Sequence, residues 1–211
     1  MYTEVREMNK KLFCIIGKSA TGKDTIYTRL LYLSKTILDH PYQLYPLITC
    51  TTRPIRPGET DGKEYHFVTV DELNRLMELG KVIEHRVYHT VHGDWHYFTT
   101  DDVIDLEHKN YITIATLESY QKLRDYYGED RVVPLYITVP DDRRLIRAVK
   151  REKQQKTNEY SEVCRRYLAD ENDFSEEKLK ECGITEQFVN DDLTECTQQI
   201  LNKITKEVSG E

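Results

Sequence analysis

Short apolar runs alternate along the chain with segments of helical periodicity. Three runs rich in β-branched residues are too short for helices, which predicts buried strands at 12–16, 111–115 (YITIA) and 132–139 (VVPLYITV). Two weaker runs predict strands at 47–51 and 186–190. Apolar residues recur at helical spacing in three other segments, which predicts helices at 25–38, 118–127 and 192–208. This alternation predicts an α/β fold with a central parallel sheet and helices on both faces.

Two segments interrupt this pattern. Residues 52–100 are rich in Pro, Gly and charge, with a helix predicted at 71–79 and a short strand at 81–87, so we expect an inserted lobe there. Residues 141–173 are helical in pattern and dense in Arg and Lys. We therefore expect one domain over 1–211. Its parts are a core (10–51, 101–140 and 184–211), the inserted lobe (52–100) and a helical segment (141–183).

Composition narrows the class of protein. The chain has 211 residues with 37 acidic and 30 basic side chains, a net charge of −7, which gives no reason to expect a nucleic-acid partner. The first residues lack the apolar core of a secretory signal, and no apolar stretch approaches the roughly 20 residues that span a bilayer. The five cysteines are scattered without metal-ligand spacing, which favours reduced thiols in the cytoplasm.

The stretch GKSATGKDT carries the first candidate chemistry. Two glycines five residues apart, Gly17 and Gly22, are followed by Lys23, directly after a predicted strand and before a predicted helix. In such a loop successive N–H groups and the helix N-terminus hold phosphate oxygens, and the lysine offsets charge during phosphoryl transfer. The alternative is an ordinary strand–turn–helix connection with a solvated lysine. The candidate ATP phosphate-binding residues are Gly17, Ser19, Ala20, Thr21, Gly22, Lys23, Asp24 and Thr25.

Asp24 departs from the usual pattern, in which a hydroxyl residue directly follows the lysine and contacts Mg²⁺. The first hydroxyl here belongs to Thr25, one residue later. The loop is similar in this respect to those of small nucleotide kinases of the adenylate kinase type, whose Mg²⁺ is held largely through water. This similarity favours a kinase of a small acceptor, with Thr25 near a water-bound Mg²⁺, over a GTPase-type switch.

The stretch TTRPIRPGETDGKEYHFV carries the second group of candidate binding residues. Arg53 and Arg56 are three residues apart, and Tyr65 follows. Arginine forks match phosphate oxygens in a two-pronged manner, and a tyrosine hydroxyl adds a donor. On composition alone, a proline-rich surface loop with solvated charge remains an equal alternative.

These two stretches, together with VIEH (82–85) and FVNDDL (188–193), resemble the guanylate kinase family over essentially the whole chain. The resemblance implies the three-layer fold of P-loop kinases, with an inserted acceptor-binding lobe and a helical lid. It implies ATP-dependent conversion of GMP or dGMP to the diphosphate, with Mg²⁺ and without a covalent intermediate. It also implies a role for Glu84 in accepting hydrogen bonds from guanine. The implied acceptor-binding residues are Thr49, Arg53, Arg56, Tyr65, Glu84, Tyr97 and Thr99.

The resemblance also extends to the donor side. Lid arginines that close over the transferring phosphate correspond to Arg147, Arg151 and Arg166, and Asn190 corresponds to a position that lines the adenine of ATP. Arg147 and Arg151 are four residues apart, on one face of a helix. The candidate catalytic residues are therefore Lys23, Arg53, Arg147, Arg151 and Arg166.

The match breaks at two places. The family has an acidic pair after the inserted lobe where this chain has Ala115 and Thr116, and Phe98 follows Tyr97 where a small residue is usual. Both changes affect the specificity for the acceptor base more than they affect phosphoryl transfer. A kinase of another phosphorylated acceptor, such as a different nucleoside monophosphate or ribose 1,5-bisphosphate, is therefore an alternative. A non-catalytic module that binds phosphopeptides is another, against which the intact glycine loop argues.

Overall fold

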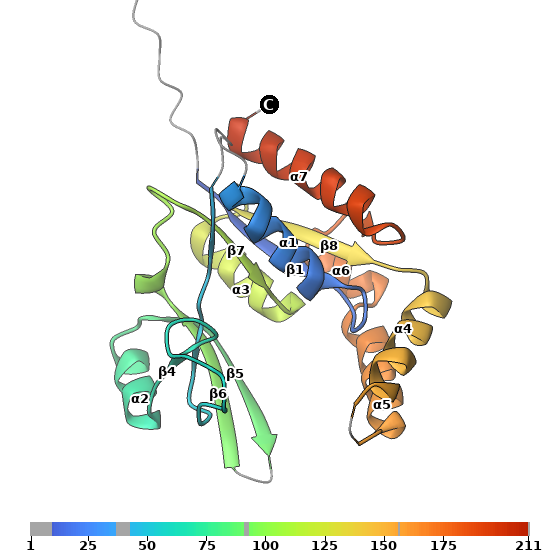
Figure 1. Ribbon diagram of the computed structural model, residues 1–211. Coiled ribbons are helices and arrows are strands. Elements are labelled where there is room, and N and C mark those ends of the chain that lie inside the picture. The colour runs from blue at the N-terminus through green and yellow to red at the C-terminus, as the bar shows by residue number, and fades with distance from the viewer. Residues whose placement is uncertain (1–9, 37–42, 91–92, 156, 211) are drawn as a thin grey trace, which may run out of the picture.

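A computed structural model describes residues 10–36, 43–90, 93–155 and 157–210. A five-stranded sheet lies at the centre, and every neighbouring pair of its strands is parallel, which confirms the expected architecture (Figure 1). The strand order is β2-β7-β1-β8-β9. The strands are β1 (Leu12–Ile16), β2 (Leu44–Pro46), β7 (Asn110–Ile114), β8 (Val132–Thr138) and β9 (Phe188–Val189).

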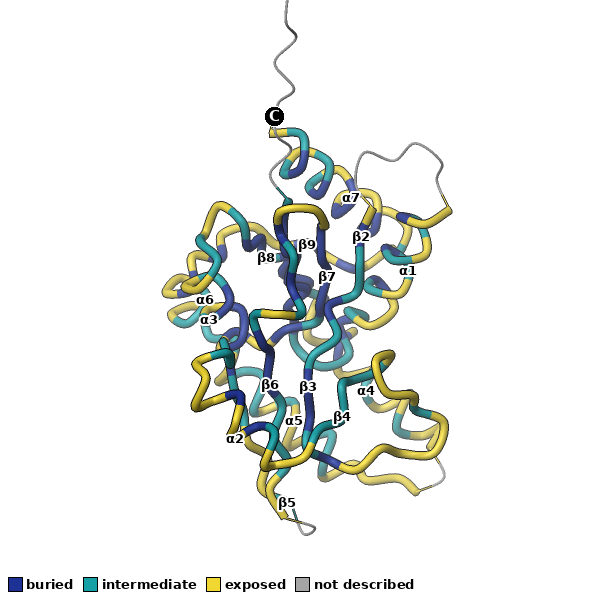
Figure 2. Tube along the Cα trace, turned by 90° about the vertical axis from the view of Figure 1, so that its left-hand side faces the viewer, coloured by how far each residue is buried: buried dark blue, intermediate teal, exposed yellow. Residues whose placement is uncertain are grey.

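Helices cover both faces of this sheet. On one face, Phe13 and Ile15 of β1 pack in a cluster that includes residues of α1 (Lys23–Thr36) and α7 (Leu193–Ser209). On the other face, the alternate residues of β1 pack with α3 (Leu117–Tyr127) and with the segment that follows α6 (Glu176–Glu181). The central strands are buried and the outer helix surfaces are exposed (Figure 2). The continuous apolar run of β1 is thus explained by burial on both faces.

A second sheet forms the inserted lobe. It contains β3 (Cys50–Thr51), β4 (His66–Phe67), β5 (Val82–Thr90) and β6 (Gly93–Thr100) in the order β4-β3-β6-β5, with α2 (Val70–Glu78) packed on it. Strands β5 and β6 form a long antiparallel hairpin. A short 3-10 helix, Asp101–Val103, follows β6 on the way back to the core.

Two further helices, α4 (Asp141–Lys153) and α5 (Tyr160–Asp173), lie in the segment predicted to be a lid, and we refer to them as the lid helices. The lid and the inserted lobe extend from the same end of the core (Figure 1). This end carries the carboxyl ends of the parallel strands, where open α/β sheets bind their ligands.

Several predicted elements differ from the structure. Of the strand predicted at 47–51, only Cys50 and Thr51 form a strand, β3, while β2 ends at Pro46 and belongs to the other sheet. The strand predicted at 81–87 extends to Thr90 and pairs with β6, which was not predicted. The helical segment 141–173 is two helices, and α6 lies in the remainder of the expected helical segment 141–183. Helix α1 begins two residues earlier than predicted, and its predicted end at residue 38 lies outside the described residues.

Helix starts follow from local side chains. Thr69, Thr116, Ser175 and Asp192 each accept hydrogen bonds from backbone N–H groups in the first turns of α2, α3, α6 and α7. Such caps satisfy donors that the helix itself leaves unpaired. In the part of the chain that the structure describes, no helix has both the length and the apolar character that crossing a membrane requires.

Candidate active site

The glycine loop connects β1 to α1, the position in the fold where the sequence predicted a phosphate-binding loop. Gly22 and Ala20 have positive φ angles of 89° and 64°. A Cβ on Gly17 would lie 2.6 Å from the carbonyl oxygen of Ile137, and one on Gly22 would lie 2.5 Å from the amide nitrogen of Asn190. Glycine is therefore required at Gly17 by the close approach of a backbone carbonyl, and at Gly22 by the positive φ and by the nearby side chain of Asn190.

Asn190 and Arg147 support this loop from its far side. The amide of Asn190 is buried and donates to the carbonyl oxygen of Thr21 at 2.7 Å, and Arg147 donates to the carbonyl oxygen of Asn190 at 3.0 Å. Asn190 therefore braces the loop, and its predicted contact with adenine stays a prediction. Arg147 does not line the cavity between α4 and α5 that the other two predicted lid arginines line.

The first turn of α1 directly follows the glycine loop. Asp24 and Thr25 are exposed there, and Lys23 lines a cavity of about 840 Å³, the central cavity. The loop contributes Gly17 and Ser19 to the same cavity, and the inserted lobe contributes Arg86 and Tyr88. One space thus adjoins both the candidate phosphate-binding lysine and the lobe expected to bind the acceptor.

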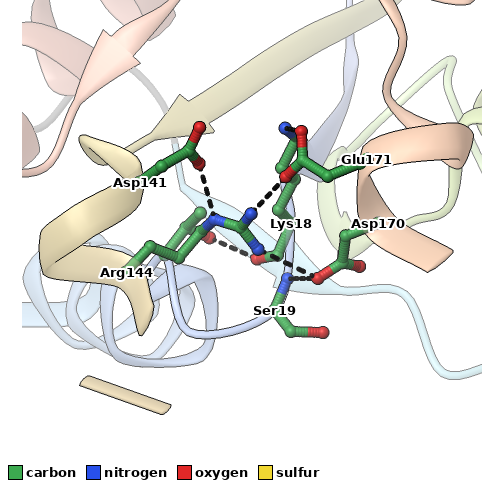
Figure 3. Close-up of polar contacts among 7 residues, drawn as sticks. Lys18, Ser19, Asp141, Arg144, Asp170 and Glu171 are labelled. Carbon is green, nitrogen blue, oxygen red and sulfur yellow. Dashed lines mark hydrogen bonds and ion pairs between the residues drawn. The ribbon is translucent and has the colours of Figure 1, made fainter. Parts of the chain in front are cut away.

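Carboxylates of the lid contact the loop directly (Figure 3). Asp170 accepts a hydrogen bond from the backbone N–H of Ser19 at 2.7 Å, and Glu171 pairs with Lys18 at 2.7 Å. Both carboxylates also pair with Arg144 of α4, which is 1% exposed. The guanidinium of Arg144 reaches Asp141 at 3.1 Å as well. The lid helices are therefore tied to each other and to the loop by one charged network.

The sequence did not single out Arg144, because nothing in the spacing of this arginine-rich helix distinguishes a buried arginine from an exposed one. The predicted lid arginines lie elsewhere. Arg151 and Arg166 line a cavity of about 450 Å³ between α4 and α5, which Ser19 and Asp170 also line. At the surface, Arg166 pairs with Glu162 at 2.7 Å. The structure thus brings two of the three predicted lid arginines together, close to the loop.

The two arginines of the inserted lobe that were predicted to bind the acceptor phosphate, Arg53 and Arg56, both have partners. The buried guanidinium of Arg53 makes a two-pronged contact with Glu59, at 2.7 and 2.6 Å, and lies over the rings of Tyr65 and Phe67. Hydrogen bonds from Arg53 are the main reason that the pKa of Glu59 is lowered to about 2. Arg56 lies 5.8 Å from the centre of the Trp95 ring.

A second cavity, the lobe cavity, brings together several predicted acceptor residues. It has a volume of about 460 Å³ and is lined by Thr49, Tyr65 and Tyr97, with Arg86 and Tyr88. The Tyr97 ring meets the rings of Tyr65 and Tyr88 edge-on, at 5.5 and 5.3 Å between centres. Burial raises the pKa of Tyr65, so its hydroxyl remains a hydrogen-bond donor at neutral pH.

Glu84 lies beneath these cavities, at 2% exposure. Its carboxylate accepts hydrogen bonds from Thr99 at 2.8 Å, Ser119 at 3.0 Å and Arg86 at 3.1 Å. The predicted residues Glu84 and Thr99 are therefore in direct contact. Ser119 and Arg86 were not predicted. Strand alternation could have identified Arg86, because residues two apart on a strand share a face.

The structure places the residues that break the family pattern, Ala115, Thr116 and Phe98, in two different environments. Ala115 and Thr116 line the central cavity, and Thr116 caps α3 and hydrogen-bonds to Ser119. Phe98 is fully buried and packs with Leu73 and Leu76 beneath α2. Phe98 therefore forms part of the core of the inserted lobe and does not line the central or the lobe cavity.

Comparisons with known proteins agree with this geometry. The family model described as guanylate kinase matches residues 9–207. A guanylate kinase of Porphyromonas gingivalis is 29% identical over 200 residues, which cover 93% of this chain and 97% of that one. A guanylate kinase of Cupriavidus metallidurans is 30% identical over 189 residues, covering 86% and 78%. The crystal structure of guanylate kinase from Anaplasma phagocytophilum has a similar fold, with a TM-score of 0.61 at 20% identity over 95% of this chain and 87% of that one.

Proposed function

Because the chain belongs to the guanylate kinase family, we propose that it transfers the γ-phosphoryl group of ATP to GMP or dGMP, giving ADP and the corresponding diphosphate. A nucleoside monophosphate kinase needs donor phosphates and acceptor phosphate in one space that excludes bulk water. The observation that carries the proposal is the central cavity, which the loop residues Gly17 and Lys23 and the lobe residues Arg86 and Tyr88 line together.

The reaction requires no covalent intermediate. An oxygen of the acceptor phosphate forms a bond to the γ-phosphorus, and the bond from that phosphorus to the bridging oxygen of ADP breaks. The loop N–H groups and Lys23 hold the donor phosphates and offset the charge that develops on the leaving oxygen. Arg151 and Arg166 line the cavity between α4 and α5, which Ser19 also lines. These two arginines approach the transferring phosphate when the lid closes. Arg147 is the third lid arginine. Asn190 adjoins the adenine.

ATP enters this reaction with Mg²⁺, which neutralises charge on the phosphate oxygens when bound. The residues present fit such an ion. The exposed Thr25 hydroxyl lies on the first turn of α1, while no three His, Cys, Asp or Glu side chains among the described residues form a metal site. Donor phosphates and water would therefore supply most of its ligands, as Mg²⁺ prefers, with Thr25 nearby.

The acceptor lies against the inserted lobe. Arg53, Arg56, Tyr65 and Tyr97 hold its phosphate, with Glu59 fixing the fork of Arg53 until the phosphate arrives. Thr49, Thr99 and Glu84 belong to the part of the acceptor site that recognises the base. We also place the protein in purine nucleotide metabolism in the cytoplasm.

One observation favours a second candidate. Ala115 and Thr116 line the central cavity where the family pattern has acids, so these two positions supply no carboxylate, although Glu118 lines the same cavity. A kinase of ribose 1,5-bisphosphate, or of another nucleoside monophosphate, would suit this change. The buried carboxylate of Glu84, a group that base recognition uses, weighs against an acceptor without a base.

The test is ADP release from MgATP, measured with and without GMP, for the wild type and for Lys23→Ala. Release should depend on GMP, and Lys23→Ala should reduce kcat by roughly 100-fold or more because it removes a charge that acts in the transition state. Circular dichroism and thermal unfolding should show an intact fold. Near-normal turnover in folded Lys23→Ala would remove this loop from the mechanism.

A further inference from the structure

We propose that Arg86 is a further catalytic residue, which binds the phosphate of the acceptor on the side that faces the donor phosphates. In the free protein this arginine pairs with Glu84, and guanine takes its place on that carboxylate when GMP binds. The inference rests on the proposed function, since it adds a residue to the acceptor site of a GMP kinase. Arg86 belongs to neither of the two motifs that indicated the phosphate-binding residues in the sequence.

Arg86 lies where the two cavities of the site meet. It lines the central cavity with Lys23 of the glycine loop, and it lines the lobe cavity with Tyr65 and Tyr97. Three of the described residues line both cavities, and Arg86 is the charged one. If the glycine loop and the lobe bind their phosphates as proposed, the acceptor phosphate lies at this junction, beside Arg86.

The charge of Arg86 acts on the part of the lobe that is expected to hold the phosphate. Burial raises the pKa of Tyr65, and the positive charges of Arg53 and Arg86 both oppose this shift. Arg86 also pairs in register with Tyr97, across the hairpin of β5 and β6. Two guanidinium groups thus lie near one tyrosine hydroxyl, an arrangement suited to a phosphate dianion.

Most hydrogen-bond donors of Arg86 are available to a ligand. Its Nε donates to Oε2 of Glu84 at 3.1 Å, and within the described part of the chain its two terminal nitrogens make no hydrogen bond. In contrast, both terminal nitrogens of Arg53 donate to Glu59. A guanidinium carries five N–H donors, so those on the terminal nitrogens of Arg86 remain for phosphate oxygens. The side chain of Arg86 is 21% exposed, so an incoming phosphate can reach it.

Binding of guanine to Glu84 releases Arg86. Oε1 of this carboxylate accepts from Thr99, while Oε2 accepts from Ser119 and Arg86. A carboxylate has about four acceptor positions, so these three donors leave about one for the two donors of guanine, N1–H and N2–H. The 3.1 Å contact with Arg86 is the longest of the three. Guanine therefore displaces the arginine, and recognition of the base moves a guanidinium to the phosphate of the same nucleotide.

The residues at positions 115 and 116 suit this role. Ala115 and Thr116 line the central cavity together with Arg86, and neither carries a charge. An acid at either position, as in the family pattern, would lower the positive potential in this cavity and compete with phosphate for the arginine. Glu118 lines the same cavity, but its carboxylate pairs with Lys122 at 2.7 Å.

Arg86 acts by position and charge alone. Transfer forms the bond from an acceptor phosphate oxygen to the γ-phosphorus and breaks the bond from that phosphorus to the bridging oxygen of ADP, which keeps the electron pair. Arg86 exchanges no proton in this step. Its guanidinium holds the attacking phosphate in line with the donor and offsets the negative charge of two phosphates in contact.

The test begins with Arg86→Gln, which keeps an N–H donor for Glu84 but removes the charge. We expect kcat/KM for GMP to fall roughly 100-fold. The matched control is Arg75→Gln, at an exposed arginine of α2 that pairs with Glu72, and it should equal the wild type. Circular dichroism reports whether each variant is folded. A folded Arg86→Gln with kcat/KM within about threefold of the wild type would show that Arg86 serves only as a partner of Glu84, and would overturn the proposal.

Guanosine, which has the base and no phosphate, provides the second arm. In Arg86→Gln the dissociation constant of GMP should rise roughly tenfold, because a charge-assisted contact is lost. The inhibition constant of guanosine against GMP should not rise. Equal losses of affinity for guanosine and GMP would place Arg86 at the base and overturn the proposal. Should Arg86→Gln not fold, Arg86→Met is judged by the same two outcomes.

The wild type separates the two levels of the account. A folded wild type without GMP turnover would refute the proposed function, and this inference with it. A wild type that turns over GMP, together with Arg86 variants that do so equally well, would refute this inference alone.

Discussion

The carboxylate of Asp170 accepts a hydrogen bond from the backbone N–H of Ser19, at 2.7 Å, inside the loop that we assign to the donor phosphates. An anion from the lid thus lies on a donor group of the kind that phosphate oxygens seek. The same carboxylate pairs with the buried Arg144, at 3.3 Å. The state of the loop and the position of the lid are therefore linked through one side chain.

Asp170→Asn should lower KM for ATP by roughly fivefold, which corresponds to about 1 kcal/mol, and leave KM for GMP unchanged. The amide has no negative charge to compete with, or repel, the incoming phosphates. The measurement is KM for ATP at saturating GMP. Asp125→Asn makes the same charge change on an exposed part of α3 and serves as the control. A raised KM for ATP in Asp170→Asn would show that Asp170 supports the binding-competent loop.

Arg144→Met should reduce the free energy of unfolding by about 3 kcal/mol. The variant leaves the carboxylates of Asp170 and Glu171 next to each other without their shared cation, and Asp170 is largely shielded from water. Arg144→Lys should recover part of the loss, because an ammonium restores the charge but not the fork. Urea unfolding of the three proteins measures this. A loss below 1 kcal/mol for Arg144→Met would contradict the account of the network.

The histidine pair of the hairpin should make stability depend on pH. His85 and His96 are 2.7 Å apart between ring nitrogens, with parallel stacked rings. Burial, followed by the charges of His96 and Lys122, lowers the pKa of His85, while Glu84 opposes the shift. The unfolded chain then binds the proton more tightly. Stability from this group is complete above pH 6.5 and is lost as the pH falls below that value.

Unfolding by urea at several pH values between 7.5 and 5 checks this dependence. The wild type should lose more stability on acidification than His85→Gln, whose neutral amide can still donate to His96. Parallel profiles for the two proteins would show that the pair does not titrate in this range.

The sequence predicted the core of this fold well because buried parallel strands produce continuous apolar runs. Strands β1, β7 and β8 were predicted nearly at their observed bounds, and Gly17, Gly22 and Lys23 indicated the loop. Strand β6 was not predicted, since Asp94 and His96 interrupt its apolar pattern and the strand is exposed at its start and buried only at its end.

For the candidate site, the sequence singled out residues only where a motif names them. Arg144 pairs with Asp170 and Glu171, which lie 26 and 27 residues further along the chain. Only the packing of α4 against α5 brings these side chains together. Ser119 reaches Glu84 across 35 residues for the same reason. Local spacing carries no information about such contacts.

The central claim is that this protein phosphorylates GMP, and kcat/KM over a panel of acceptors tests it most directly. The panel comprises GMP, dGMP, AMP, CMP, UMP and ribose 1,5-bisphosphate, each with MgATP, and the readout is ADP release. We predict turnover of GMP and dGMP at least about 100-fold above that of the other acceptors, because a base that mismatches two donor or acceptor positions loses about 3 kcal/mol. Preferred turnover of ribose 1,5-bisphosphate or of a pyrimidine nucleotide, or no turnover by the folded protein, would contradict it.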